Sequence, residues 1–200
     1  MKRVQADIAI VGAGTAGLAA AIAAAESGAR VIAFEKASVT GGTGNMSMGL
    51  FAVESKLQRK SRIGLTRDQA FKIFMEYTHW RPDARLVRAI IDKSASTIDW
   101  LENIGVEFND PETHFSGSYT VWHTVRSHAG TGHAGSSLML KAMTDRAGAL
   151  GVKIYFRTPV QKILKEGGRI VGVMAEDESG EAIRADVKAV IISTGGFGDN

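Results

Sequence analysis

Apolar residues follow two patterns along this chain, short continuous runs and longer stretches with helical spacing. Residues 6–11 form a run that is apolar except for Asp7, residues 15–27 form an alanine-rich stretch that ends at Gly28, and a second run, apolar after Arg30, follows at residues 30–34. Continuous apolar runs are typical of parallel strands buried on both faces, and glycine commonly ends a helix. The order strand, helix, strand therefore predicts a βαβ unit over residues 5–35.

Helical spacing dominates the middle of the chain. A capping box at Thr66-Arg67-Asp68-Gln69 and an apolar pattern that ends at Gly105 predict a helical insertion over about residues 66–105. Residues 106–130 lack a clear period, which predicts an irregular segment, and helical spacing returns at about residues 136–150. Residues 55–62 are strongly basic, so we expect them to be exposed.

Strand patterns return in the last quarter of the chain. Three short runs joined by glycine-containing turns predict an antiparallel β-meander over about residues 160–186. A last apolar run begins at Ala189, and we expect residues 189–198 to form a final buried strand with its exit. The predicted fold class is α/β: one Rossmann-like domain over residues 1–200 with a parallel sheet and a small antiparallel meander.

The junction between the first strand and the first helix carries a Gly-x-Gly-x-x-Gly motif at Gly12, Gly14 and Gly17. The first glycine permits a tight turn, the second lets backbone amides approach a pyrophosphate, and the third lets the helix pack closely. The unpaired first amides of a helix and its dipole stabilise such an anion. Glu35 ends the second strand 23 positions after Gly12 (35 − 12 = 23), near the usual place of the acid that binds a ribose. We therefore predict a dinucleotide site, and Glu35 argues against a nicotinamide dinucleotide with a 2′-phosphate.

Composition narrows the chemistry of this site. The chain has no cysteine, which excludes disulfides, a thiolate nucleophile and thiolate-bound iron–sulfur clusters within it, so redox chemistry must come from a bound cofactor. The formal charge of +3 arises from 24 basic and 21 acidic residues that are interspersed, which does not favour a nucleic-acid partner. The basic N-terminus imitates a secretory signal, but Asp7 and three glycines interrupt the apolar stretch. We expect no membrane span and a cytoplasmic location.

The order of these parts resembles the flavoprotein subunit of succinate dehydrogenase and fumarate reductase and its soluble relatives, which include aspartate oxidase, urocanate reductase and ketosteroid dehydrogenases. The resemblance covers nearly the whole chain. Besides the glycine motif, it rests on a glycine-rich loop at residues 40–49, on Thr158 and Val160, and on a terminal Ser193-Thr-Gly-Gly-Phe, with serine in place of the usual alanine. It implies an FAD cofactor and hydride transfer between FAD and a carbon–carbon bond next to a carboxylate or a ketone. It implies FAD-binding roles for Gly12, Gly14, Thr15, Ala16, Gly17, Glu35, Lys36, Gly41, Gly42, Thr43, Gly44, Met48, Gly49, Val160, Thr194, Gly195 and Gly196.

Two departures from the family pattern change what the resemblance implies. Membrane-linked members hold the flavin covalently through a histidine in the loop after the second strand, but Thr43 stands at the matching position and residues 36–51 contain no histidine. This predicts non-covalent FAD. The family chain also continues beyond the Thr-Gly-Gly-Phe motif into a capping domain, absent from these 200 residues, which supplies the catalytic residues. The catalytic residues therefore stay unknown, and we expect a capping domain or partner subunit and a small carboxylate or enone substrate.

Cationic side chains in the irregular segment are the visible candidates for holding a substrate carboxylate. Arg126 and His128 are the foremost, with His123 and His133 beside them, because arginine binds a carboxylate through two parallel N–H donors. Ordinary surface or interdomain positions also fit these residues, and that interpretation stays open. The histidine spacing of five residues matches neither a helix face nor a common metal site, so we predict no metal.

Two other functions remain open from the sequence. The chain can be the cofactor-binding module of a split or truncated enzyme, without turnover of its own, or an NAD-dependent dehydrogenase with an ordinary dinucleotide fold. The predicted meander and the Thr-Gly-Gly-Phe motif argue against the second, because a nicotinamide fold continues with alternating strands and helices.

Overall fold

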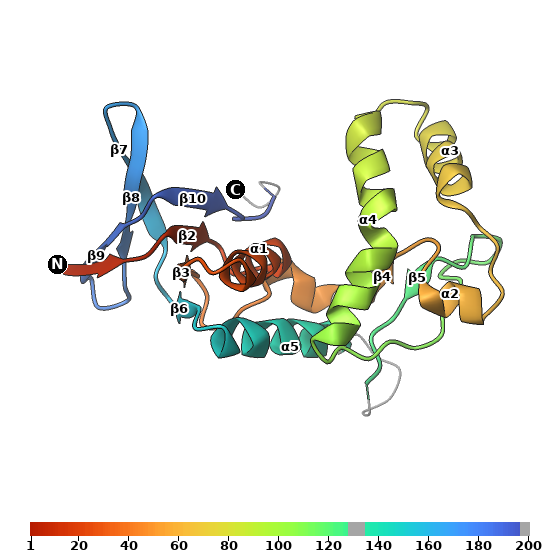
Figure 1. Cartoon of the computed structure of the whole chain (residues 1–200), viewed down its shortest axis with the longest axis horizontal. Coiled ribbons are helices and arrows are strands. Elements are labelled where there is room, and N and C mark those ends of the chain that lie inside the picture. Colours follow the sequence, from red (N-terminus) through yellow and green to blue (C-terminus); the bar gives the residue numbers. More distant parts are fainter. Residues whose placement is uncertain (128–134, 197–200) are drawn as a thin grey trace. The chain divides into compact units, whose positions relative to one another are not determined.

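The computed structural model describes residues 1–127 and 135–196 (Figure 1). The chain divides into two compact units, the first made of residues 1–46 and 140–200 and the second of residues 47–139. The fold class is α/β, with a parallel sheet and a small antiparallel sheet, as the sequence predicts. No helix in the described part of the chain is long and apolar enough to cross a bilayer.

A parallel four-stranded sheet organises the first unit. Its strands lie in the order β10-β2-β3-β6 and are β2 (Ile8–Val11), β3 (Val31–Phe34), β6 (Lys153–Tyr155) and β10 (Ala189–Ile192). Helix α1 (Thr15–Glu26) connects β2 to β3, and α5 (Gly135–Ala149) precedes β6 in the sequence. All four residues of β3 are buried, which explains its uninterrupted apolar run.

A second four-stranded sheet lies in the same unit, in the order β1-β9-β8-β7 (Figure 1). Its strands are β1 (Lys2–Gln5), β7 (Val160–Glu166), β8 (Arg169–Glu176) and β9 (Ala182–Asp186). Strands β7, β8 and β9 are antiparallel neighbours, which confirms the predicted meander. Side chains from both sheets, among them Ala9, Phe34, Val173 and Ala185, share one apolar cluster.

Strand β1 is absent from the sequence prediction. It pairs in parallel with β9, so that Val4 lies opposite Ala185. Lys2, Arg3 and Gln5 are exposed and Val4 is half-buried, so no apolar run marks this strand. A charged, exposed edge strand of this kind is common in β-sheets because it discourages pairing with other chains.

Helices dominate the second unit. They are α2 (Lys56–Lys60), α3 (Arg67–Tyr77) and α4 (Ala84–Asn103), and a short antiparallel pair joins β4 (Leu50–Phe51) to β5 (Trp122–His123). Helix α3 begins at the capping box predicted at Thr66, where both reciprocal bonds with Gln69 are formed. Met75 of α3 and Val87 and Ile91 of α4 meet in one apolar cluster.

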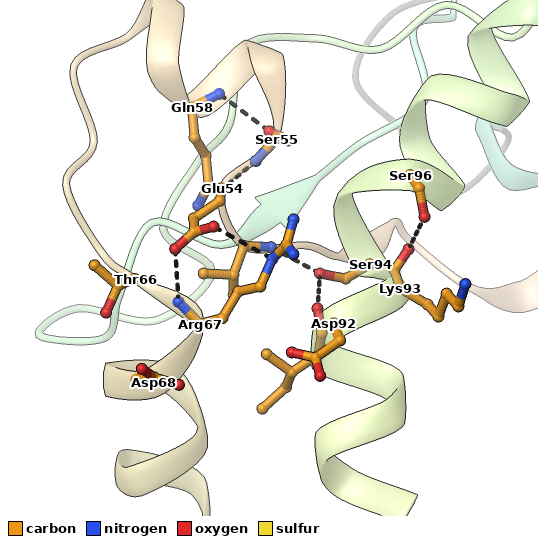
Figure 2. A network of polar contacts seen from close by, with 12 residues as sticks. Glu54, Ser55, Gln58, Thr66, Arg67, Asp68, Asp92, Lys93, Ser94 and Ser96 are labelled. Carbon is orange, nitrogen blue, oxygen red and sulfur yellow. Dashed lines mark hydrogen bonds and ion pairs between the residues drawn. The ribbon is translucent and has the colours of Figure 1, made fainter.

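The expectation that residues 55–62 are exposed is wrong for Ser55 and Gln58, which are fully buried. They form a second capping box, in which the Ser55 hydroxyl accepts from the Gln58 amide at 3.1 Å and Gln58 Oε1 accepts from the Ser55 amide at 3.2 Å. Figure 2 shows this pair beside the contact of Glu54 with Arg67. Gln58 Nε2 donates to the Thr120 carbonyl at 2.8 Å, so Ser55 and Gln58 face inward although their neighbours are basic.

Candidate functional site

The turn between β2 and α1 requires glycine at its first position. Gly12 has a φ of +93°, which an L-residue with a side chain rarely adopts. A Cβ atom at Gly12 would lie 2.6 Å from the Ser193 carbonyl oxygen, so the backbone after β10 leaves no room for one. The Gly12 amide donates to the Phe34 carbonyl at 2.8 Å. The turn is thus packed between the strands on either side of β2.

Helix α1 begins at this turn with an open N-terminus. Gly14 is its N-cap residue and forms no side-chain cap bond, and its first turn contains no acidic residue. Thr15 and Ala16 are exposed. A Cβ atom at Gly17 would overlap the Gly12 carbonyl oxygen, so the third glycine lets the helix approach the turn, as the motif predicts. The first amides of such a helix lack intrahelical partners and stabilise a phosphate group.

Glu35 lies beside the turn rather than in solvent. Its side chain is buried, with 7% of the residue exposed. Its Oε2 accepts from the Ala13 amide at 2.8 Å and its Oε1 from the Ala37 amide at 2.8 Å. A carboxylate offers about four lone-pair sites, so each oxygen keeps capacity for a ribose hydroxyl. The acid therefore lies between the phosphate turn and the loop that follows β3.

The first half of the glycine-rich loop also contacts the turn. The Gly41 amide donates to the Ala13 carbonyl at 2.9 Å, and Gly41 and Gly42 have φ values of +104° and +49°. Residues Gly42–Met46 form a 3-10 helix, and a Cβ atom at Gly44 would overlap the Thr15 hydroxyl. This half of the loop, with Thr43 exposed in it, lies against the N-terminus of α1.

The second half of the loop belongs to the other unit. The structure places Met48 and Gly49 in the second unit, where a Cβ atom at Gly49 would lie 2.6 Å from the His123 carbonyl oxygen. The close approach of the loop to β5 therefore requires glycine at position 49, independently of any ligand that the loop contacts.

The remaining predicted residues of the first unit lie at the same end of the parallel sheet. The Thr158 amide donates to the Glu35 carbonyl at 2.9 Å, which fixes the segment that leads to Val160 at the start of β7. Beyond β10, Thr194, Gly195 and Gly196 are exposed, as is Lys36 after Glu35. Ligands of open α/β sheets bind at the carboxyl ends of the strands, and these residues follow the carboxyl ends of β2, β3 and β10.

The candidates for binding a substrate carboxylate either have other partners already or lie outside the described residues. Arg126 is already engaged, because its Nη1 lies 3.5 Å from Glu107 Oε2 and its Nη2 donates to the Phe108 carbonyl at 3.3 Å. His128 and His133 lie outside the described residues, as does Phe197 of the terminal motif. Among the described residues, no group of three or more His, Cys, Asp or Glu is placed to hold a metal ion.

His123 is not a cation for a carboxylate. It is fully buried, and its Nε2 lies 2.8 Å from the Ser55 hydroxyl while its Nδ1 lies 3.1 Å from the Val121 carbonyl. A carbonyl can only accept, so Nδ1 carries the proton and Nε2 accepts from Ser55. Burial lowers the pKa of the imidazole. The expectation that His123 can fix a carboxylate is therefore wrong, because the ring is buried and both of its nitrogens already have partners.

Comparison with known proteins identifies the family. The profile of the FAD binding domain matches residues 7–200, nearly the whole chain. The chain belongs to this family. The match confirms the cofactor that the resemblance implies, and its range includes the glycine motif, Glu35 and the described part of the terminal motif.

Relatives of this FAD-binding domain are flavoenzymes of greater length. A vinyl phenol reductase from Lactiplantibacillus plantarum is 35% identical over 196 residues, which span 97% of this chain and 38% of that protein. An NADH:fumarate oxidoreductase from Klebsiella pneumoniae is 31% identical over 195 residues, which span 97% of this chain and 21% of that protein. The solved structure of a flavocytochrome c3 fumarate reductase in its open conformation matches with a TM-score of 0.87 at 27% identity, over 98% of this chain and 35% of that one. This FAD-binding domain thus spans well under half the length of the relatives that it matches.

Two contacts at the turn were not predictable from the motif. Ala13 and Ser193 form hydrogen bonds there, to Glu35 and to the backbone of the turn respectively. Alanine in a glycine motif gives no sign that its amide has a side-chain partner. For Ser193 the only sequence signal is a hydroxyl at a position where the family usually has alanine.

Proposed function

We propose that this domain binds FAD non-covalently, with the pyrophosphate at the N-terminus of α1 and the adenosine ribose at Glu35. The observation that carries the proposal is that an uncapped helix N-terminus and a buried carboxylate meet at the same Gly12–Gly14 segment: Gly14 is the N-cap of α1, and the Ala13 amide donates to Glu35. A helix N-terminus attracts the pyrophosphate, and the free lone pairs of the carboxylate accept the ribose hydroxyls.

The proposed binding residues come from several segments. In the first unit they are Gly12, Gly14, Thr15, Ala16, Gly17, Glu35, Lys36, Gly41, Gly42, Thr43, Gly44, Val160, Thr194, Gly195 and Gly196. The family resemblance also implies Met48 and Gly49, which belong to the second unit. Those in the first unit act mainly through backbone groups, which is why glycine recurs among them and why the site needs little side-chain chemistry.

Non-covalent attachment follows from the residues of the loop. A covalent flavin link needs a nucleophilic side chain such as histidine, and the loop at residues 36–51 offers Thr43 and no histidine. We therefore expect denaturation to release the flavin intact.

The proposed activity of the whole protein is that of a flavin oxidoreductase. Bound FAD would supply the hydride chemistry, and the residues of this chain would bind the cofactor and orient it. The relatives are named as reductases of vinyl phenol and fumarate, which supports a small substrate with a carbon–carbon double bond next to an activating group.

One experiment tests the proposal. Uptake of FAD and, separately, of NAD by the purified protein is measured by equilibrium dialysis. Excess FAD is then removed, the visible absorbance of the complex is recorded, and the complex is denatured and filtered. A flavin spectrum that moves entirely into the filtrate supports non-covalent FAD binding. Flavin that stays with the polypeptide would refute the non-covalent link, and uptake of NAD without FAD would favour the nicotinamide alternative.

A further inference from the structure

Ser193 follows β10 directly and contacts the backbone of the phosphate turn, defined here as residues Gly12–Gly14. Its hydroxyl lies 2.8 Å from the Gly12 carbonyl oxygen and 3.0 Å from the Val11 carbonyl oxygen, and its single proton is shared between these two acceptors. Its own amide donates to the Val11 carbonyl at 2.8 Å. The side chain thus continues the pairing of β10 with β2 beyond the last strand residues and extends it into the turn.

Ser193 occupies the space that two glycines leave open, with its backbone at Gly12 and its side chain at Gly17. A Cβ atom at Gly17 would lie 2.7 Å from the Ser193 hydroxyl oxygen, and one at Gly12 would lie 2.6 Å from the Ser193 carbonyl oxygen. The hydroxyl therefore lies between the turn and the first turn of α1, within van der Waals reach of both. Ser193 is half-buried, so its bonds are partly shielded from water.

The peptide group between Gly12 and Ala13 is held at both of its ends. The Gly12 carbonyl accepts from Ser193, and the Ala13 amide donates to Glu35 Oε2 at 2.8 Å. In a trans peptide the carbonyl and the N–H point in opposite directions, so the two side chains act from opposite sides. Ser193 follows β10 and Glu35 follows β3, and these two strands flank β2 in the sheet.

This peptide group needs such fixation. It can rotate through ψ of Gly12 and φ of Ala13, and glycine, which has no Cβ, restricts its own ψ little. A rotation of the Gly12–Ala13 peptide would exchange the places of its carbonyl and its N–H, and the partial negative charge of the carbonyl would then approach the anion that the helix N-terminus attracts.

We propose that Ser193 is a positioning residue of the cofactor site, whose hydroxyl, together with Glu35, holds the Gly12–Ala13 peptide in the orientation that accepts a pyrophosphate. The inference rests on the proposed function, since it concerns the same site. Ser193 acts on the ligand through the turn, so its loss weakens the binding of any ligand that carries the pyrophosphate. A merely structural serine would instead affect folding without a preference for such ligands.

The test compares Ser193→Ala with Ser27→Ala in the whole protein. Ser27 also donates its hydroxyl to a backbone carbonyl, that of Ala23 at 2.9 Å, but at the opposite end of α1. We measure the dissociation constants of FAD, by quenching of flavin fluorescence, and of ADP, by competition, and the melting temperature without ligand. Loss of one hydrogen bond weakens binding by about five- to tenfold, so we expect Ser193→Ala to weaken FAD and ADP by that same factor and Ser27→Ala to change neither.

Ser193→Thr provides the second variant, because it keeps the hydroxyl, and we expect it to bind FAD within about twofold of the natural protein. Equal FAD affinity of Ser193→Ala and the natural protein overturns the inference while leaving the proposed function intact. An equal loss in Ser193→Thr, or an equal loss in Ser27→Ala, also overturns it, because the hydroxyl or its place would then be irrelevant. A natural protein that takes up no FAD overturns the proposed function and this inference together.

Discussion

Replacement of Glu35 by glutamine should destabilise the protein even when no cofactor is present. The carboxylate accepts two backbone hydrogen bonds, from Ala13 and Ala37, each at 2.8 Å, and is almost fully buried. Glutamine keeps one acceptor oxygen but turns an NH₂ group toward the other amide. One bond to a charged acceptor is lost and a buried N–H is left without a partner, which costs about 2–3 kcal/mol.

Thermal unfolding of the FAD-free protein, followed by circular dichroism, measures this loss. For a chain of this size each kcal/mol shifts the melting temperature by about 2–4 °C, so Glu35→Gln should lower it by about 4–12 °C. The cofactor must be absent, because a ligand bound only to the folded state adds its own stabilisation.

Glu26→Gln is the matched control. Glu26 lies in the same unit at the end of α1 and pairs with Arg146 at 2.8 Å, but both side chains are partly exposed. Such a surface pair contributes about 0.5 kcal/mol, so its loss should lower the melting temperature by about 1–2 °C. Equal melting temperatures for Glu35→Gln and Glu26→Gln would refute the reasoning, because Glu35 would then have no role without ligand.

Two further predictions concern other parts of the chain. Burial lowers the pKa of His123 from its ordinary 6.5. Between the lowered pKa and about 6.5, the unfolded state therefore binds more protons than the folded state. The free energy of unfolding should fall as the pH drops through this range. Urea titrations at several pH values should show a shallower fall for His123→Gln, and parallel profiles would contradict the assignment. Arg157 has a left-handed φ of 50° and forms an exposed ion pair with Glu178. Arg157→Gly and Arg157→Ala both lose the ion pair. Only glycine avoids the cost of a left-handed backbone at a residue with a Cβ atom, about 1–2 kcal/mol. The glycine variant should therefore be the more stable of the two by about 1 kcal/mol in urea unfolding, and equal stabilities would show that the left-handed backbone is not strained.

The parts of the site that depend on local sequence were predictable. The turn at Gly12, the helix from Thr15 and the acid at Glu35 all lie within one βαβ unit. Their spacing along the sequence is therefore enough to predict that they lie close together in the fold. Glycine at residues 12 and 17 marks close approaches that a Cβ atom would prevent, and this requirement is visible without the structure.

Contacts between distant segments were not predictable. Strand β1 pairs with β9 and Ser193 reaches the turn at Gly12, partners that lie at opposite ends of the sequence. Gln58 is buried because the Thr120 carbonyl accepts from it, although its neighbours are basic. The capping box from Ser55 to Gln58 was a readable local signal, but its burial depends on a partner that only the folded chain supplies.

The position of β2 between β3 and β10 has a consequence for synthesis on the ribosome. β3 is available soon after β2, but β10 and Ser193 are translated 158 residues after Glu35 (193 − 35 = 158), which takes about 8–30 s at ordinary elongation rates. During that interval one edge of β2 lacks its native partner, while the intervening residues 47–139 form a compact unit of their own. The nascent chain therefore exposes an unpaired apolar edge of β2, open to chaperones, until β10 has left the exit tunnel.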